Sequence, residues 1–370
     1  MQTTLSPLLG SYNAQDCEFL LQTVDAHFLS IEEKEKQIQS GQCHYSDVLN
    51  KESKPSEQYQ QLFLNFTEQY KQTLAEHVFK LARTIHHNQS GDIVLLSLAR
   101  AGTPIGVLLK RALERFFKRT VTHYAISIIR DRGIDTVALD YLLKIKQYNA
   151  TSLVFIDGWT AKGVITRELK SSVLSYNHQH NTNIQPALYV ISDTGGVADF
   201  CATKEDYPIP SSMLNSTVSG LISRSLWRDA NLNAFHGCVI NEHLRAADQS
   251  QWFVDEISAC FSDSMLTKIN PLSPHSNMPE ADLKNKMDGF ISSIKQQYGI
   301  EDVNYIKPGI AEATRVMLRR VPSLLIVRSK RCEKVAHLLM LAKEKGVTVQ
   351  VDPSLLFEAC ALIKLINTEN

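Results

Sequence analysis

The segment from residue 153 to residue 166 places a carboxylate, hydroxyl groups and a glycine directly after an apolar run. Asp157 follows the apolar residues 153–156, and a helical pattern begins after Gly163. Backbone N–H groups at a helix N-terminus bind phosphate, and a carboxylate can accept hydrogen bonds from vicinal hydroxyls. The segment therefore predicts a ribose-phosphate cradle formed by Thr160, Ala161, Lys162, Gly163 and Thr166. An ordinary turn, with Asp157 as the helix cap and Lys162 in solvent, is the alternative.

A second segment, residues 93–106, repeats the order of apolar run, small-residue turn and helical pattern. Its turn contains Arg100, Ala101 and Gly102, and Thr103 and Pro104 suit the N-cap and the first position of a helix. An arginine at such a turn can hold a second phosphate group with a rigid fork of donors. Because parallel strands end at one edge of a sheet, both turns can face a common ligand there.

Two further segments could cover such a ligand. Residues 128–135 contain charged side chains and a glycine, as a lid that closes over a diphosphate would need. A solvent-exposed loop with cancelling charges would have the same composition. Residues 206–225 are rich in hydroxyl groups, which suits a mobile cover over a polar ligand and also any exposed loop.

His236 and Cys238 stand two residues apart at the start of a short apolar run. On an extended strand they would face the same side, so the imidazole could activate the thiol as a nucleophile. A buried cysteine that packs beside a histidine is the alternative. The sequence shows no third group that would orient the imidazole of a Cys–His site.

The composition excludes several classes of protein. The chain has 370 residues, 44% of them hydrophobic, which is ordinary for packed chains of two or three domains. Its 39 basic residues equal its 39 acidic residues, so any nucleic-acid-binding surface must be local. The seven cysteines show no Cys-x-x-Cys spacing, and we find neither a signal peptide nor about 18 consecutive apolar residues. We expect a cytoplasmic protein with reduced thiols and no membrane contact.

The hydrophobic periodicity predicts the elements that would position these residues. Residues 18–29 and 58–85 have a helical period, so residues 1–90 are expected to form a helical region. Residues 91–261 alternate short apolar runs with helical patterns, which predicts an α/β domain around a mostly parallel sheet. A linker and helix at 262–300 then lead to a small unit at 301–370 that ends in a helix at 354–366. The expected strands are residues 93–97, 122–129, 153–156, 187–191, 324–327 and 347–351.

The two turns together resemble the phosphate loops of the type I phosphoribosyltransferase fold. By this resemblance, Arg100, Ala101 and Gly102 contact a diphosphate, Asp157 contacts the ribose, and residues 160–163 hold the 5-phosphate. The resemblance implies a phosphoribosyltransferase that binds 5-phosphoribosyl diphosphate or a related ribose phosphate. Asp157 and Arg100 would be catalytic, and Mg²⁺ would be held through the diphosphate. The sequence departs from the pattern at Gly158, where a second acidic residue is usual, and at Val164, where a hydroxyl is usual.

Residues 305–315 resemble the Gly-x-Asn-Glu-x-Thr-Lys signature of the pelota and kink-turn ribosomal protein superfamily, which has a small α/β/α fold. The residues that this resemblance brings to structured RNA are Lys307, Gly309, Glu312 and Arg315. We expect Glu312 and Arg315 to be exposed on the first turn of a helix. Ala311 stands where the family has Asn. Residues 302–366 contain five more basic than acidic residues, so RNA affinity should depend steeply on salt. An ordinary basic helix is the alternative.

The order of segments along most of the chain resembles the StiP-type family of tellurite-resistance and stress gene clusters. The residues that carry the resemblance are 10–12, 99–104, 157–163, 214–224 and 235–238. It implies a phosphoribosyltransferase-like domain followed by a pelota-type RNA-binding domain, in a stress-response pathway of nucleoside-type biosynthesis. Two alternatives stay open. One is an RNA-binding regulator that senses a nucleotide without turnover. The other is a cysteine peptidase that uses Cys238 and His236, because members of the family carry that label.

Overall fold

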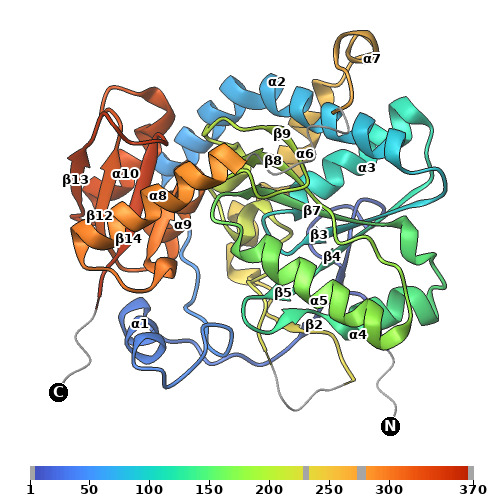
Figure 1. Cartoon of the computed structure of the whole chain (residues 1–370), viewed down its shortest axis with the longest axis horizontal. Helices are drawn as coiled ribbons and strands as arrows, with labels where there is room; N and C mark the ends of the chain where they lie inside the picture. The colour runs from blue at the N-terminus through green and yellow to red at the C-terminus, as the bar shows by residue number, and fades with distance from the viewer. Residues whose placement is uncertain (1–4, 228–232, 273–280, 366–370) are drawn as a thin grey trace.

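The computed structural model describes residues 5–227, 233–272 and 281–365. The chain forms a larger α/β lobe and a smaller C-terminal lobe, which lie side by side in Figure 1. Two prolines of the expected linker, Pro274 and Pro279, lie outside the described residues. In the described part of the chain, no helix has the length and apolar character needed to cross a membrane.

A six-stranded sheet forms the centre of the larger lobe, and all of its neighbouring strands are parallel. The strand order is β1-β4-β3-β7-β8-β9. The strands are β1 (Glu18–Leu20), β3 (Ile93–Leu98), β4 (Val121–Ile126), β7 (Leu153–Thr160), β8 (Leu188–Asp193) and β9 (Phe200–Thr203). Two small ladders join β5 (Ile128–Ile129) to β6 (Gly133–Ile134) and β2 (Gln22–Thr23) to β10 (Gly237–Cys238). The α/β class and the parallel sheet are therefore confirmed.

Helices cover both faces of this sheet (Figure 1). Along β3, Leu95 faces the core beneath α2, α3 and α6, whereas Leu96 faces the core beneath α4 and α5. A strand that is buried on both sides reads as a continuous apolar run, which explains the pattern seen in the sequence. The helices of this lobe are α1 (Ile31–Gln39), α2 (Glu57–Asn88), α3 (Thr103–Phe117), α4 (Thr136–Asp140), α5 (Val164–His180), α6 (Ser250–Ala259) and α7 (Met265–Lys268).

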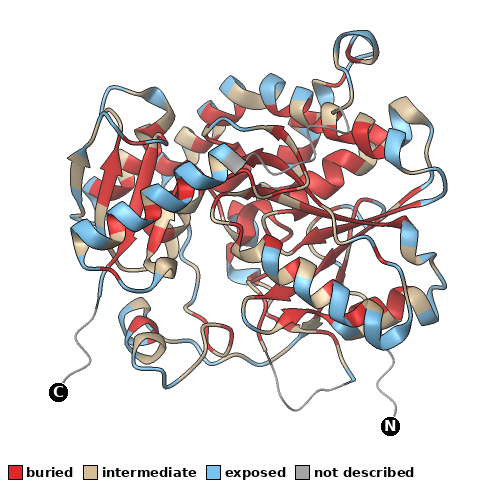
Figure 2. Ribbon diagram, in the orientation of Figure 1, coloured by how far each residue is buried: buried red, intermediate tan, exposed pale blue. Residues whose placement is uncertain are grey.

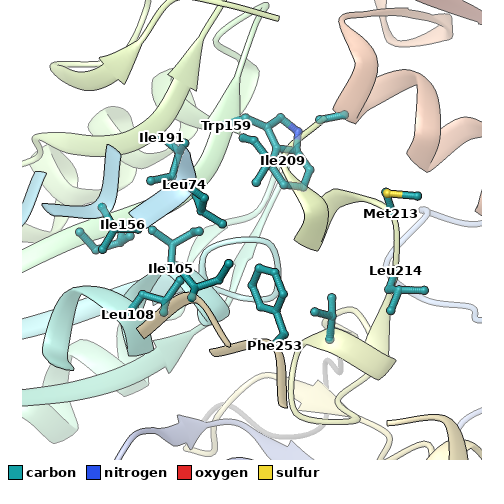
Figure 3. Close-up of a cluster of buried hydrophobic side chains, with 14 of the residues drawn as sticks. Leu74, Ile105, Leu108, Ile156, Trp159, Ile191, Ile209, Met213, Leu214 and Phe253 are labelled. Carbon is teal, nitrogen blue, oxygen red and sulfur yellow. The ribbon is translucent and has the colours of Figure 1, made fainter. Parts of the chain in front are cut away.

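The core between the sheet and α2 is continuous and apolar. Figure 3 shows Leu74 of α2, Ile105 of α3 and Phe253 of α6 close to Ile156 of β7 and Ile191 of β8. All five side chains are fully buried. Burial of one side chain of this size stabilises the fold by about 1.5–3 kcal/mol, so this core fixes the sheet that carries the polar turns.

The expectation of a purely helical N-terminal region is wrong for residues 18–29. Residues 18–20 form β1 and add a strand to the sheet through parallel pairing with β4. Phe19 and Leu20 are buried on opposite faces of the sheet, which is the alternation of a strand. The second predicted segment is confirmed as α2, a helix of 32 residues.

The C-terminal lobe contains a four-stranded mixed sheet between two helical layers. Its order is β11-β14-β12-β13, with α9 and α10 on one face and α8 on the other (Figure 1). Figure 2 shows that its strands are mostly buried. The elements are α8 (Ala281–Tyr298), β11 (Ile306–Pro308), α9 (Ile310–Arg319), β12 (Pro322–Val327), α10 (Ala336–Glu344), β13 (Thr348–Val351) and β14 (Ala359–Ile363).

The last predicted helix, residues 354–366, is wrong. Residues 359–363 form β14, which pairs with both β11 and β12 and has all five residues buried. A short apolar run fits a buried strand and a buried helix equally well, so periodicity alone could not separate the two.

Helix α1 crosses from the larger lobe to the C-terminal lobe. The Lys34 ammonium donates to the Arg319 carbonyl at 2.9 Å, and the Gln39 amide donates to the Lys364 carbonyl at 2.9 Å. The fully buried Glu35 forms an ion pair with Arg320. The N-terminal segment therefore clamps the end of α9 and becomes part of the surface between the lobes.

Candidate functional site

A cleft of about 300 Å³ lies between the two lobes. Its walls come from α1 and the loop after it, from β7 and the turn that follows, and from α9. Of the residues that the structure describes, nine cationic side chains line the cleft but only two carboxylates do, Asp157 and Glu312. The cations are Lys34, Arg100, Arg130, Lys162, Arg224, Lys307, Arg315, Arg319 and Arg320. Such an excess of one sign attracts an anionic ligand.

Asp157 lies inside β7 rather than at its end. The strand continues to Thr160 because Trp159 and Thr160 pair with β8. Oδ1 of Asp157 accepts the N–H of Gly158 at 2.7 Å, and burial raises the pKa of this carboxyl to about 7. In this position Asp157 faces the cleft but does not cap α5, so its role as a helix cap is excluded.

The predicted phosphate turn also borders the cleft. Thr160, Ala161 and Gly163 line it, and Gly163 takes φ +69° as the N-cap of α5. The Lys162 ammonium donates to the carbonyls of Val303 and Ile306, both at 2.6 Å. This lysine is neither in solvent nor free for a ligand, because it attaches the turn to the C-terminal lobe. The Thr166 hydroxyl is buried without a hydrogen-bond partner.

Arg100 carries a counter-ion that the sequence did not indicate. Its guanidinium lies 2.5 Å from Glu52 and donates to the Ile222 carbonyl at 2.9 Å. The peptide bond between Ala99 and Arg100 is cis. Gly102, rather than Thr103, is the N-cap of α3, and a Cβ on this glycine would lie 2.5 Å from the Ile156 carbonyl oxygen. Close packing against β7 thus explains the glycine, and Ala101 lies outside the cleft lining.

Glu312 and Arg315 face the larger lobe, so the expectation that they are exposed is wrong. Trp159 Nε1 donates to Glu312 at 3.2 Å, and Lys307 and Arg315 lie 3.6 and 3.5 Å from the same carboxylate. Burial alone would raise the pKa of Glu312, but these two cations lower it to about 2. The Arg315 guanidinium lies over the Trp159 ring, 4.6 Å from its centroid. The two lobes therefore meet through this group of side chains.

The N-terminus of α9, where Gly309 was expected to meet RNA, contacts a carboxylate of the larger lobe. Asp206 accepts the N–H groups of Ile310 and Glu358 at 2.8 and 2.9 Å. Burial raises the pKa of Asp206 to about 6. In this structure Asp206 takes the position that a phosphate would need at this helix end.

Three cleft residues that were not among the predicted site residues have unused donors, and two of them, Arg224 and Ser225, end the hydroxyl-rich segment 206–225. Within the described residues, the Arg319 guanidinium has no hydrogen-bond or ion-pair partner. Arg224 donates to the Val48 carbonyl, but its Nη1 has no partner. Ser225 is 6% exposed, and its hydroxyl also lacks a partner. Arg224 and Ser225 are neighbours in the sequence, but Arg319 is too far from them for any local pattern to connect the three.

His236 and Cys238 are not arranged as a catalytic pair. Cys238 is fully buried, and burial raises the pKa of its thiol to about 12. His236 Nδ1 hydrogen-bonds Ser127 Oγ at 2.7 Å, and its backbone N–H donates to Asp135 at 2.6 Å. Among the residues that the structure describes, no hydrogen bond joins the imidazole to the thiol. The structure is that of a packed cysteine near a structural histidine.

The residues that the structure describes do not form a metal site. In the described ranges, no three His, Cys, Asp or Glu side chains are grouped to hold an ion. The two cleft carboxylates are poor ligands for Mg²⁺, because Glu312 is paired with cations and the raised pKa of Asp157 favours its neutral form.

Two protein families match the sequence, one over most of the larger lobe and one over the C-terminal lobe. The family described as "Tellurite-like stress resistance cysteine protease StiP" matches residues 10–258, and "PELOTA RNA binding domain" matches residues 286–365. The chain is 38% identical over 354 residues to "Cysteine protease StiP" of Acinetobacter baylyi, covering 92% of this chain and 90% of that protein. The chain therefore belongs to the StiP family and carries a C-terminal pelota-type domain.

These comparisons correct the predicted function. The matching family and the relative are both named as cysteine proteases, so the phosphoribosyltransferase hypothesis, with 5-phosphoribosyl diphosphate as its ligand, is wrong. The enzyme class to which the family points is a peptidase. The likeness of the two turns to phosphate loops misled the prediction because strand-turn-helix units with small residues serve many functions.

Proposed function

We propose that the protein binds RNA in the cleft between its lobes. The observation that carries this proposal is the excess of nine cations over two carboxylates in a cleft bordered by the pelota-type domain. Guanidinium groups pair with phosphate oxygens through charge-assisted hydrogen bonds. A cleft of about 300 Å³ is too small for an A-form duplex, so the RNA that enters it is single-stranded.

The test is a titration of the full chain with a fluorescent single-stranded RNA, followed by anisotropy. We expect the affinity to fall steeply between about 50 and about 200 mM salt, because bound cations replace counter-ions on the phosphates. Arg315→Ala should weaken binding about tenfold or more. Arg331→Ala, an exposed change in the same lobe, is the matched control and should have little effect. Equal affinities for the two variants would place RNA outside the cleft.

A second candidate function is thiol-dependent proteolysis, which the name of the 38% identical relative favours. Cys238 and His236 stay the predicted pair. Because Cys238 is fully buried, proteolysis at this thiol requires the short β10 segment to open first. Cleavage of a fluorescent casein by the wild type, Cys238→Ser and Cys332→Ser tests this candidate. Loss of activity in Cys238→Ser alone supports it, and full activity in that variant assigns proteolysis to another thiol.

Three finer expectations accompany these proposals and stay predictions. They are a type I phosphoribosyltransferase-like arrangement of the parallel sheet, Mg²⁺ carried by the phosphates of a ligand, and a cytoplasmic location. The pairing of Glu312 with cations leaves Mg²⁺ dependent on the ligand for its coordination.

A further inference from the structure

Five of the nine cleft cations form ion pairs with four carboxylates of the protein. These ion pairs are Arg100 with Glu52, Arg130 with Asp131, Arg320 with Glu35, and Lys307 and Arg315 with Glu312. Such pairs cannot give their full charge to a ligand without breaking an existing contact. They position the walls of the cleft and give a ligand only part of their charge.

The other four cations, Lys34, Lys162, Arg224 and Arg319, have no carboxylate partner within the described residues. The two lysines donate to neutral amide or carbonyl oxygens. With respect to the described part of the chain, Arg224 leaves Nη1 without a partner, and Arg319 leaves its whole guanidinium without one. Unused donors of the cleft are thus concentrated on two arginines.

These two arginines lie among like charges. Burial lowers the pKa of Arg319 well below its usual value, and the neighbouring Arg315, Arg100 and Arg224 lower it further. Burial likewise lowers the pKa of Arg224, to about 10. Glu52 offsets part of this repulsion at both arginines, and Tyr45 offsets part of it at Arg224. Grouping partly buried cations still costs free energy, so the arrangement is stabilised when an anion binds. The Ser225 hydroxyl, 6% exposed and without a partner, lines the same cleft.

The charge of a phosphate and the number of its acceptor oxygens decide which form of phosphate suits Arg224, Arg319 and Ser225. A phosphodiester inside a strand carries one negative charge and two free oxygens. A phosphate monoester carries about two charges near pH 7 and has three strong acceptor oxygens. Two guanidinium groups with unused donors and one hydroxyl match the monoester better.

We propose that the cleft recognises a nucleotide through a phosphate monoester, held by Arg319, Arg224 and Ser225. This deepens the RNA-binding proposal and rests on it: the ligand is the phosphorylated end of an RNA strand, and a free nucleoside monophosphate carries the same chemistry. The volume of the cleft, about 300 Å³, is at the lower end of small-ligand sites and suits one end of a chain better than its middle.

Calorimetric titration of the full chain with three RNA octamers of one sequence tests the proposal. One octamer carries a 5′-phosphate, one carries a 3′-phosphate, and one has hydroxyls at both ends. We expect one phosphorylated octamer to bind at least about tenfold tighter than the hydroxyl octamer at pH 7.5. Uridine monophosphate should compete for the site, whereas uridine should not.

The outcomes separate this inference from the RNA-binding proposal. Equal binding of the three octamers overturns the inference and leaves RNA binding in place. Binding of uridine monophosphate without binding of any octamer supports the monoester and overturns RNA as its source. If neither the octamers nor the nucleotide bind, both proposals fall.

Variants locate the site. Arg319→Gln should reduce the preference for the phosphorylated octamer to near onefold while some binding of the hydroxyl octamer persists. Arg331→Gln, an exposed change in the same lobe, should leave the preference unchanged. Ser225→Ala removes only one hydroxyl and should lower the preference by a few fold, which provides a test if Arg319→Gln does not fold. A full preference in both Arg319→Gln and Ser225→Ala would overturn the assignment.

Discussion

The surroundings of Cys238 and the basic cleft differ in how far their polar groups are already satisfied by the protein. His236 uses its Nδ1 on Ser127, and the thiol of Cys238 is packed in the core. In the cleft, the Arg319 guanidinium and one nitrogen of Arg224 have no partner among the described residues. A residue type that can do chemistry therefore indicates a site only when its donors, acceptors or lone pairs are left for a ligand.

The reactivity of the cysteines offers the largest test of this contrast. At pH 8, iodoacetamide should modify Cys238 roughly 100-fold more slowly than the partly exposed Cys332, because a buried thiol with a raised pKa is rarely a thiolate. Peptide mapping by mass spectrometry measures both rates. In denaturant the two should converge. A fast reaction at Cys238 in the native protein would show that its surroundings open, and it would strengthen the peptidase candidate.

Asp206 does not line the cleft, but a substitution there should disturb the docking of the two lobes that form it. Asp206→Ala leaves the N–H groups of Ile310 and Glu358 without their acceptor, so we expect a loss of about 2 kcal/mol in the free energy of unfolding. Urea denaturation measures the loss, and small-angle scattering reports any separation of the lobes. Asp206→Asn keeps one acceptor and should lose less. No change in either property for Asp206→Ala would mean that other contacts determine how the lobes dock.

The affinity of the cleft for RNA should depend on pH in a direction set by two groups. Burial lowers the pKa of Lys34 to about 7 and raises that of Asp157 to about 7. As the pH falls from 8.5 to 6.5, Lys34 gains its proton and Asp157 loses its charge. Both changes make the cleft more positive, so affinity should rise by about fivefold to tenfold. Titrations in buffers of equal ionic strength check this, and Lys34→Arg should flatten the curve.

The smallest expected effect concerns stability at Asp157. A carboxyl whose folded pKa lies above its unfolded value destabilises the fold once it ionises, so its cost appears above about pH 4 and is complete above about pH 7. Asp157→Asn should therefore raise the free energy of unfolding by about 1 kcal/mol at pH 8 and change it little at pH 4. Thermal denaturation at the two pH values is the measurement. A loss of stability at pH 8 would indicate that the carboxylate has an unrecognised partner.

Local hydrophobic patterns predicted the secondary structure correctly where a strand or helix buries a long or regularly repeated set of apolar residues. The strands β3, β7 and β8 and the helix α2 follow from such patterns. The short strands β1 and β14 did not, since three to five apolar residues fit either a helix or a strand and only their sheet partners decide.

The site was predictable only in part. The sequence indicated Asp157, Arg100 and Arg315, and all three line the cleft. It could not indicate that Glu52 would neutralise Arg100, or that Arg224 and Arg319 would be left with free donors. Those facts depend on contacts between residues distant in the sequence, such as Glu52 with Arg100 and Val48 with Arg224, which no local spacing records.

The contacts of α1 with the C-terminal lobe determine when the cleft can form during protein synthesis. Lys34 and Glu35 contact residues that follow them by 285 positions, and Gln39 contacts one that follows it by 325. During translation these contacts can form only after Arg319, Arg320 and Lys364 have left the ribosome. The parallel sheet can form earlier, so the capacity to bind an anion between the lobes should be the last property that a newly made molecule acquires.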